Sequence, residues 1–173
     1  MDRLFWIDLE MTGLDVEKEV VIEAAAIVTD IQLAELDIYE TVVRQPQRYL
    51  EAMDAWNSEH HGRSGLTAKV PQGRAPSLVE DDLLGLVAMH FQEPAVIAGN
   101  SIAQDRLFIN RQFPRLAGKL HYRMMDVTAW KVMMSARFGL AFEKKKAHRA
   151  LDDIRESLEE MRFYLRHVTP TIR

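Results

Sequence analysis

Three apolar segments near the start of the chain have the lengths and compositions of β-strands. Residues 4–10 are rich in strand-forming side chains, and residues 20–29 form an apolar run that only Glu23 interrupts. Residues 36–43 alternate loosely between apolar and polar positions, after a plausible turn at 30–34. Because short links join the successive segments, the pattern predicts an antiparallel three-strand meander.

The rest of the chain alternates between helical and strand patterns. The predicted elements are short helices within 45–76 (including 50–60), a helix opened by a capping box at 77–80, a strand at 95–98, a helix opened by a second capping box at 101–104, a strand at 123–127, a helix ending near Phe138 and Gly139, and a last helix over about 150–167. This order favours an α/β fold, in which parallel strands extend the meander into a mixed sheet flanked by helices.

Length and composition favour an ordinary globular protein with one domain over residues 1–173. The chain has no cysteine, which excludes disulfides, thiolate zinc sites and cysteine nucleophiles. No apolar run is long enough to cross a bilayer, and the first strand begins too early for a signal or transit peptide. We therefore expect a cytoplasmic protein.

Charge is distributed unevenly along the chain. The net charge is −4, which argues against a protein that grips long nucleic acid by bulk charge. Residues 8–40 hold ten acids and one base, whereas residues 100–149 hold eleven bases and three acids. One interpretation is a metal site on the acidic side and a phosphate site on the basic side. The alternative is a chance asymmetry on solvated faces.

Two carboxylates, Asp8 and Glu10, lie inside the first predicted strand. Alternate residues of a strand share a face, so both side chains point the same way. Adjacent carboxylates at a half-buried site are costly unless a cation neutralises them, and Mg²⁺ or Mn²⁺ prefers such oxygen ligands. The alternative is an edge strand that carries two solvated acids.

Further acids lie in the first turns of predicted helices, at Asp105 and at the adjacent Asp152 and Asp153. Acids at these positions also stabilise a helix dipole, which is a sufficient structural reason for each of them alone. His148 lies five residues before Asp153, where a loop position lets both side chains reach one site. Beside several carboxylates, this histidine is a candidate general base rather than a solvated surface residue.

These residues together resemble the three motifs of the DEDD exonuclease superfamily, and the histidine marks its DEDDh branch. The motifs are Asp8-x-Glu10 with residues 11–14, the segment 99–105 that ends in Asp105, and His148-x-Ala150-x-x-Asp153. Longer strings are similar to those of the oligoribonuclease family, at residues 6–15, 121–123 and 152–157. The resemblance extends from about residue 4 to residue 168.

The resemblance implies a ribonuclease H-like fold and a 3′→5′ exoribonuclease. Such enzymes degrade very short RNAs, including dinucleotides, to 5′-mononucleotides. By motif position, two divalent metals, Mg²⁺ or Mn²⁺, would be held by the four acids Asp8, Glu10, Asp105 and Asp153, and His148 would act as general base. Two metals suit phosphodiester hydrolysis because they bind both sides of the scissile phosphate. Asp152 lies one place off the motif.

The resemblance also implies how substrate length is limited. Leu14 resembles a wedge between the two bases, and Trp56 resembles an aromatic partner of the 3′-terminal base. From the sequence alone, a buried core tryptophan is an equal alternative for Trp56. A cap over the 5′-phosphate would use His61, Ser101, Tyr122, Arg123, Thr128 and Lys131. The family resemblance implies a homodimer, in which His61 or Tyr122 would come from a partner subunit.

Two other functions compete with this interpretation. Another DEDDh exonuclease would share the metal site but would need an open channel for longer RNA or DNA ends. A non-catalytic nucleotide- or RNA-binding module would need no general base, so the complete set of four acids and His148 argues against it.

Overall fold

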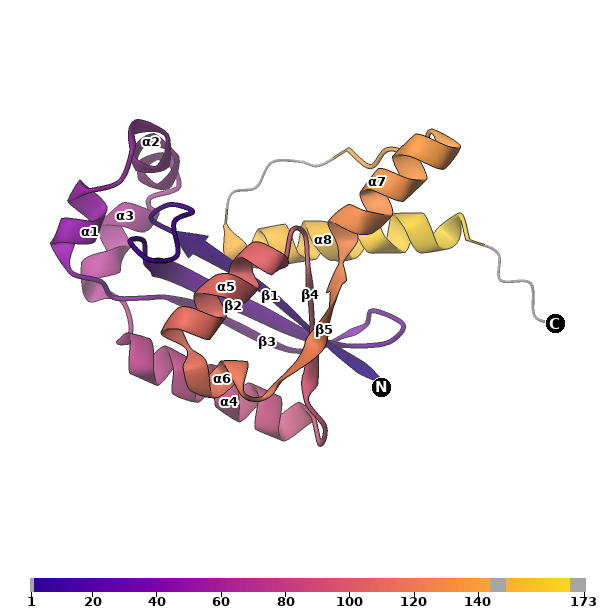
Figure 1. Ribbon diagram of the computed structural model, residues 1–173, viewed down its shortest axis with the longest axis horizontal. Helices are drawn as coiled ribbons and strands as arrows, with labels where there is room; N and C mark the ends of the chain where they lie inside the picture. Colours follow the sequence, from indigo (N-terminus) through magenta and orange to yellow (C-terminus); the bar gives the residue numbers. More distant parts are fainter. Residues whose placement is uncertain (1, 144–148, 169–173) are drawn as a thin grey trace.

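The computed structural model describes residues 2–143 and 149–168. Its centre is a mixed sheet whose five strands are β1 (Arg3–Met11), β2 (Val21–Asp30), β3 (Glu35–Val42), β4 (Ala95–Gly99) and β5 (Leu120–Asp126). The strand order is β3-β2-β1-β4-β5 (Figure 1). The first three strands are antiparallel, whereas β4 runs parallel to both β1 and β5. The predicted meander and its parallel extension are therefore confirmed.

Helices connect the strands and cover both faces of the sheet. They are α1 (Gln47–Glu51), α2 (Ala55–Arg63), α3 (Leu66–Lys69), the short 3-10 helix η1 (Val70–Gln72), α4 (Pro76–His90), α5 (Ala103–Gln112), α6 (Pro114–Ala117), α7 (Val127–Phe138) and α8 (Ala150–Arg166). Among the described residues, none of these helices has the length and apolar content needed to cross a bilayer.

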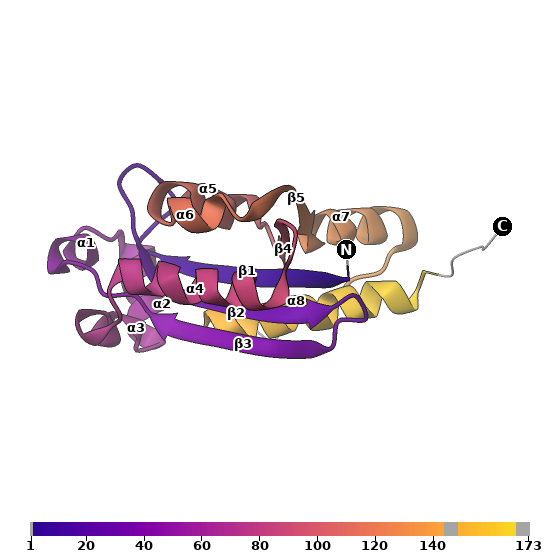
Figure 2. The ribbon, with the colours of Figure 1, turned by 90° about the horizontal axis from the view of Figure 1, so that it is seen from below.

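The side chains of β1 divide between two hydrophobic layers. Phe5, Ile7 and Leu9 pack with buried residues of α4, α5 and α6, whereas Leu4 and Trp6 pack with those of α7 and α8. Figures 1 and 2 show α4 and α8 on opposite sides of the sheet. Because side chains alternate along a strand, the even-numbered residues that follow Trp6 continue on the α8 side.

The predicted single helix over 50–60 is wrong. Helix α1 ends at Glu51, and α2 begins at Ala55 after Asp54. The Asp54 carboxylate accepts a hydrogen bond of 2.7 Å from the Asn57 amide, which makes Asp54 the N-cap of a new helix. By contrast, the predicted end of α7 at Phe138 is confirmed, because Gly139 adopts a left-handed conformation with φ of 66°.

Neither predicted capping box forms. Helix α4 begins at Pro76, so Ser77 already lies inside its first turn. The Glu80 carboxylate turns instead to α6, where it accepts hydrogen bonds from the backbone amide and guanidinium of Arg115, at 2.7 and 2.8 Å. Helix α5 begins at Ala103 without a side-chain cap. At Glu80, long-range polar contacts therefore take precedence over local capping.

Candidate active site

Three carboxylates meet where β1 passes under the start of α8. Asp8, Glu10 and Asp153 each offer one oxygen, and these atoms lie within 4.8 Å of one another. Asp8 and Glu10 come from the α8 side of β1, and Asp153 comes from the first turn of α8. Strand alternation and the packing of α8 thus bring together acids that lie far apart in the sequence.

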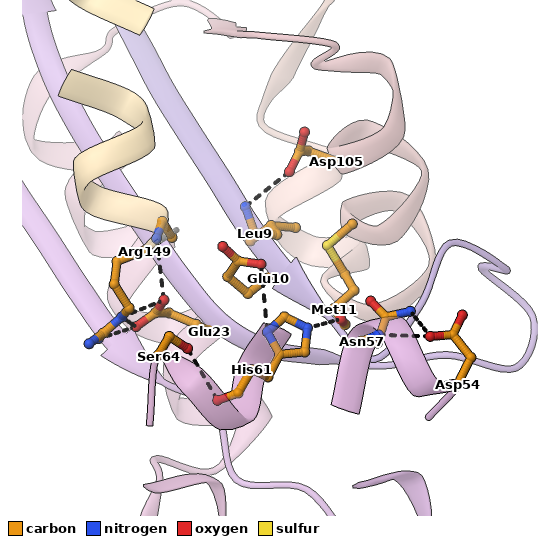
Figure 3. Close-up of polar contacts among 11 residues, drawn as sticks. Leu9, Glu10, Met11, Glu23, Asp54, Asn57, His61, Ser64, Asp105 and Arg149 are labelled. Carbon is orange, nitrogen blue, oxygen red and sulfur yellow. Dashed lines mark hydrogen bonds and ion pairs between the residues drawn. The ribbon is translucent and has the colours of Figure 1, made fainter. Parts of the chain in front are cut away.

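Glu23 anchors the start of α8 beside this cluster. It lies on β2 directly opposite Glu10, and it is fully buried. Its carboxylate accepts hydrogen bonds from Arg149 Nε, at 3.0 and 3.1 Å, from Arg149 Nη2 and from the Ala150 amide, at 3.3 Å (Figure 3). The Asp153 amide donates in turn to the Arg149 carbonyl, at 2.9 Å. These contacts tie α8, and with it Asp153, to the sheet.

Sequence reasoning missed the role of Glu23 and Arg149. Glu23 is the one acid in the apolar run 20–29, and Arg149 immediately precedes the last helix. An acid inside a buried strand requires a partner, because an unpaired buried charge is costly. That requirement was the available signal, although it does not say which of the chain's basic residues supplies the partner.

The electrostatics of the cluster favour the uptake of positive charge. Burial, and then the negative charges of Asp153, Glu23 and Asp105, raise the pKa of Glu10 to about 8, whereas Arg149 opposes the shift. Burial likewise raises the pKa of Asp105. A buried carboxyl group with a raised pKa is stabilised when a metal cation replaces its proton. The donor set therefore fits a hard divalent metal ion, which prefers carboxylate oxygens.

Asp105 is not one of the three acids that lie within 4.8 Å of one another. It is buried in α5, and its Oδ1 accepts a hydrogen bond of 3.0 Å from the Leu9 amide, between Asp8 and Glu10 in the sequence. The β1–β4 ladder pairs Phe5 and Trp6, so β4 does not occupy the Leu9 amide. The early end of β4 thus gives Asp105 access to the edge of β1.

The candidate general base, His148, lies outside the described residues. Its sequence neighbour Arg149 is held by Glu23, as described above. Asp152 is exposed on the first turn of α8, in contrast to the half-buried Asp153.

Two predicted base-contacting residues lie at the rim of the site. Leu14 is 74% exposed in the loop after β1, and its carbonyl accepts a hydrogen bond of 2.8 Å from Gln104 Nε2 on α5. Trp56 is 67% exposed, so the alternative of a buried core tryptophan is wrong. Its ring stacks on His60, with centroids 4.7 Å apart and an interplanar angle of 13°.

His61 lies inside the site of its own chain. It is buried on α2, and its Nε2 donates a hydrogen bond of 2.9 Å to the Met11 carbonyl (Figure 3). Its Nδ1 lies 4.0 Å from Glu10 Oε2. Burial lowers the pKa of His61, which favours the neutral ring. Of the two residues expected from a partner subunit, His61 is therefore supplied by the same chain as Glu10.

The other predicted cap residues lie in two places. Where β4 and β5 end, the Ser101 amide donates to Asp126 Oδ1 and Thr128 Oγ1, at 3.0 and 2.9 Å, and the Ser101 backbone is left-handed with φ of 53°. Lys131 is exposed one turn further along α7. Tyr122 lies on β5, four residues before Asp126, or about 13 Å along the strand.

Tyr122 and Arg123 form an exposed pair on the edge strand β5. Tyr122 is 75% exposed, its ring stacks on His121, and the Arg123 guanidinium carbon lies 5.2 Å from its ring centroid. The register runs from Met124 through Ile97 to Phe5, so Tyr122 lies towards the end of the sheet that is remote from Asp8. Within one chain, these two residues and His61 belong to separate places.

The fold and the carboxylate cluster define an exonuclease, since residues 5–161 match the RNase_T exonuclease family. Two curated relatives of the chain have names more specific than that of the family. The oligoribonuclease of Pseudomonas aeruginosa is 44% identical over an alignment length of 173, and the match covers 95% of each chain. The oligoribonuclease of Dichelobacter nodosus is 42% identical over an alignment length of 171, and the match covers 96% of this chain and 95% of that one. The chain belongs to the oligoribonuclease family of DEDD exonucleases, as its motifs predict.

A solved structure supports the fold independently. Exonuclease I of E. coli, in complex with a 5cy-dA13 oligonucleotide, superposes with a TM-score of 0.76 at 12% sequence identity. The match covers 98% of this chain but only 41% of that one. The predicted ribonuclease H-like α/β fold is therefore confirmed, and this likeness carries the fold alone.

Proposed function

We propose that this exonuclease is a 3′→5′ exoribonuclease that hydrolyses very short RNAs, dinucleotides above all, to 5′-mononucleotides. The observation that carries the proposal is the meeting of Asp8, Glu10 and Asp153 within 4.8 Å, in a chain of the oligoribonuclease family. We further propose that residues 1–173 act as one exonuclease domain.

The acids Asp8, Glu10, Asp105 and Asp153 are proposed to hold two divalent ions, Mg²⁺ or Mn²⁺. When bound, such ions supply charge to the scissile phosphate and lower the pKa of water. The residues of the chain then have distinct tasks. Glu23 and Arg149 hold Asp153 against β1, the Leu9 amide orients Asp105, and His148 accepts the proton of the attacking water.

The proposed substrate site extends from the carboxylates in two directions. Leu14 and Trp56 offer exposed apolar surfaces, which suit contacts to bases without sequence preference. Ser101, Thr128 and Lys131 offer hydroxyl groups and a cation, which suit the 5′-phosphate of a two-nucleotide ligand. Because the ligand is short, a few local cations suffice in a chain whose net charge is −4.

We also propose that the enzyme acts as a homodimer. The support is the exposed Tyr122–Arg123 pair on β5, which lies away from the carboxylates of its own chain and so is available to a partner's site. Sedimentation of the purified protein measures the oligomeric state. A monomer at working concentration that retains full activity would contradict this part of the proposal.

Substrate length gives the sharpest test of the function. Hydrolysis of 5′-labelled dinucleotides and ten-mers is compared in Mg²⁺ or Mn²⁺, with Asp8→Ala as the inactive control. We expect the dinucleotide to be the preferred substrate, and we expect His148→Ala to bind it without hydrolysing it. Preference for the ten-mer would indicate instead an exonuclease for longer strands, and tight RNA binding without hydrolysis would indicate a binding module.

A further inference from the structure

A second group of possible metal ligands adjoins the three carboxylates. Glu10, His60 and His61 each offer one donor atom, and these atoms lie within 4.8 Å of one another. Glu10 comes from β1, and both histidines come from α2. Glu10 is therefore common to an oxygen-only group and to a group that contains two imidazoles.

The orientation of His61 is the one that a metal ligand requires. Since a carbonyl oxygen only accepts hydrogen bonds, the contact of 2.9 Å with Met11 requires the proton to be on Nε2. The lone pair of the neutral ring is then on Nδ1, which lies 4.0 Å from Glu10 Oε2. This separation is too long for a hydrogen bond. Histidine ligands in proteins usually donate their second ring N–H to such an outer acceptor.

The spacing is close to that of one shared ion. A tetrahedral Zn²⁺ site with bonds of about 2.0–2.2 Å places two donors about 3.4 Å apart. The 4.0 Å between His61 Nδ1 and Glu10 Oε2 exceeds this by about 0.6 Å, and the widest separation in the group, at most 4.8 Å, exceeds it by about 1.4 Å. His60 is only partly buried, and its ring stacks on that of Trp56, so the two rings would shift together toward the ion.

We propose that Glu10, His60 and His61 bind a transition-metal dication that accepts imidazole nitrogen, represented by Zn²⁺. Imidazole ligands favour Zn²⁺ over Mg²⁺, which prefers oxygen. Because Glu10 serves both groups, an ion held by the histidines withdraws a ligand from the Asp8–Glu10–Asp153 cluster. Zn²⁺ thus inhibits hydrolysis in the presence of Mn²⁺, a consequence that rests on the proposed function, whereas the binding itself does not.

Zinc binding by the full-length protein tests the site directly. Zn²⁺ affinity is measured by competition with a chromophoric chelator, for the wild type, for His60→Ala and for the control His167→Ala. His167 is an exposed histidine near the end of α8, outside the group. We expect His60→Ala to lose roughly tenfold or more in Zn²⁺ affinity, and to keep its Mn²⁺ affinity within about twofold. His167→Ala should match the wild type.

Cobalt provides a second measurement that does not depend on activity. Co²⁺ is added as a spectroscopic substitute, and its visible absorption reports nitrogen ligation and coordination number. We expect the absorption of the wild type to change in His60→Ala and to be retained in His167→Ala. Equal Zn²⁺ affinities and identical Co²⁺ spectra in the wild type and His60→Ala would overturn the proposed site.

Inhibition assays separate this inference from the proposed function. With dinucleotide and fixed Mn²⁺, Zn²⁺ should inhibit the wild type at a concentration roughly tenfold lower than that needed for His60→Ala. Absence of RNA hydrolysis in every metal would contradict the proposed function, while the chelator and cobalt measurements would still decide the metal site. Normal hydrolysis with equal zinc sensitivity in both proteins would contradict only the shared use of Glu10.

Discussion

Glu10 and Glu23 are the same residue type at directly opposed positions of adjacent strands, yet the fold treats them differently. Glu23 is neutralised by Arg149 and by the Ala150 amide. Glu10 instead faces Asp8, Asp153 and a histidine, and its pKa is raised to about 8, first by burial. Like charges directly opposite one another normally destabilise a sheet. The comparison separates a carboxylate with a structural partner from one that requires an external cation.

Removing a carboxylate from the Asp8–Glu10–Asp153 cluster should have the largest effect. Asp153→Asn should lower kcat for dinucleotide hydrolysis on the order of 10³-fold, because a neutral amide attracts the cation less strongly. In metal-free buffer, the same variant should melt no lower than the wild type, since one repulsive charge is gone. The exposed neighbour supplies the control Asp152→Asn. A kcat for Asp153→Asn within tenfold of the control would contradict the metal role of Asp153.

Breaking the ion pair between Glu23 and Arg149 should affect the stability of the fold more than its activity. Arg149→Met leaves Glu23 buried without its cation, and it should lower the unfolding free energy by about 2–4 kcal/mol. Urea denaturation in chelator measures this change. The double variant Glu23→Gln/Arg149→Met removes both charges and should recover most of the loss. If the double variant is as unstable as Arg149→Met, the unpaired charge is not the cause.

The stability of the metal-free protein should depend on pH through Glu10. Folding raises the pKa of Glu10 from 4.5 to about 8, so the folded protein holds a proton that the unfolded chain has released. The unfolding free energy of the metal-free protein should therefore fall as pH rises from about 4.5 to 8, by at most about 1.4 kcal/mol per pH unit. Glu10→Gln should lack this decline.

Metal binding gives the same linkage a second readout. Because a bound cation displaces the Glu10 proton, Mn²⁺ affinity of the wild type should increase with pH up to about pH 8, by at most about tenfold per unit. Calorimetric titrations at several pH values measure both the affinity and the released protons. A flat profile between pH 6 and pH 8 would show that Glu10 is already ionised without metal.

The smallest effect is expected at the exposed partner of Arg149. Glu40 Oε1 lies 3.3 Å from Arg149 Nη2, at the surface. Glu40→Gln should change the unfolding free energy by less than about 0.5 kcal/mol, because solvent screens exposed ion pairs. A loss similar to that of Arg149→Met would mean that Glu40, rather than Glu23, is the main partner of Arg149.

Sequence patterns predict this fold where one local rule decides the outcome. The apolar run 20–29 is a buried strand, and the left-handed Gly139 ends α7. Alternation along β1 likewise predicts the shared face of Asp8 and Glu10. Local rules fail where distant partners compete, as at Glu80, which contacts Arg115 rather than capping its own helix.

The candidate site follows the same division. The acids of β1 and α8 are recognisable from motif spacing, and the structure brings Asp8, Glu10 and Asp153 together. The Glu23–Arg149 pair joins residues 126 positions apart, and local periodicity contains no information about such a pair. The place of Asp105 depends on where β4 stops, and strand ends are set by the ladder as a whole rather than by one residue.

The shortness of β4 has a consequence for how activity would be lost. Gly99 ends the strand, and a Cβ there would lie 3.1 Å from both the Ile7 carbonyl oxygen and Ile102 Cδ1. A longer β4 would add hydrogen bonds to the sheet. Its added backbone would, however, compete with Asp105 for the Leu9 amide. Lengthening β4 by two residues would therefore stabilise the fold and abolish activity, because the site needs the Leu9 amide of β1 to remain unpaired with β4.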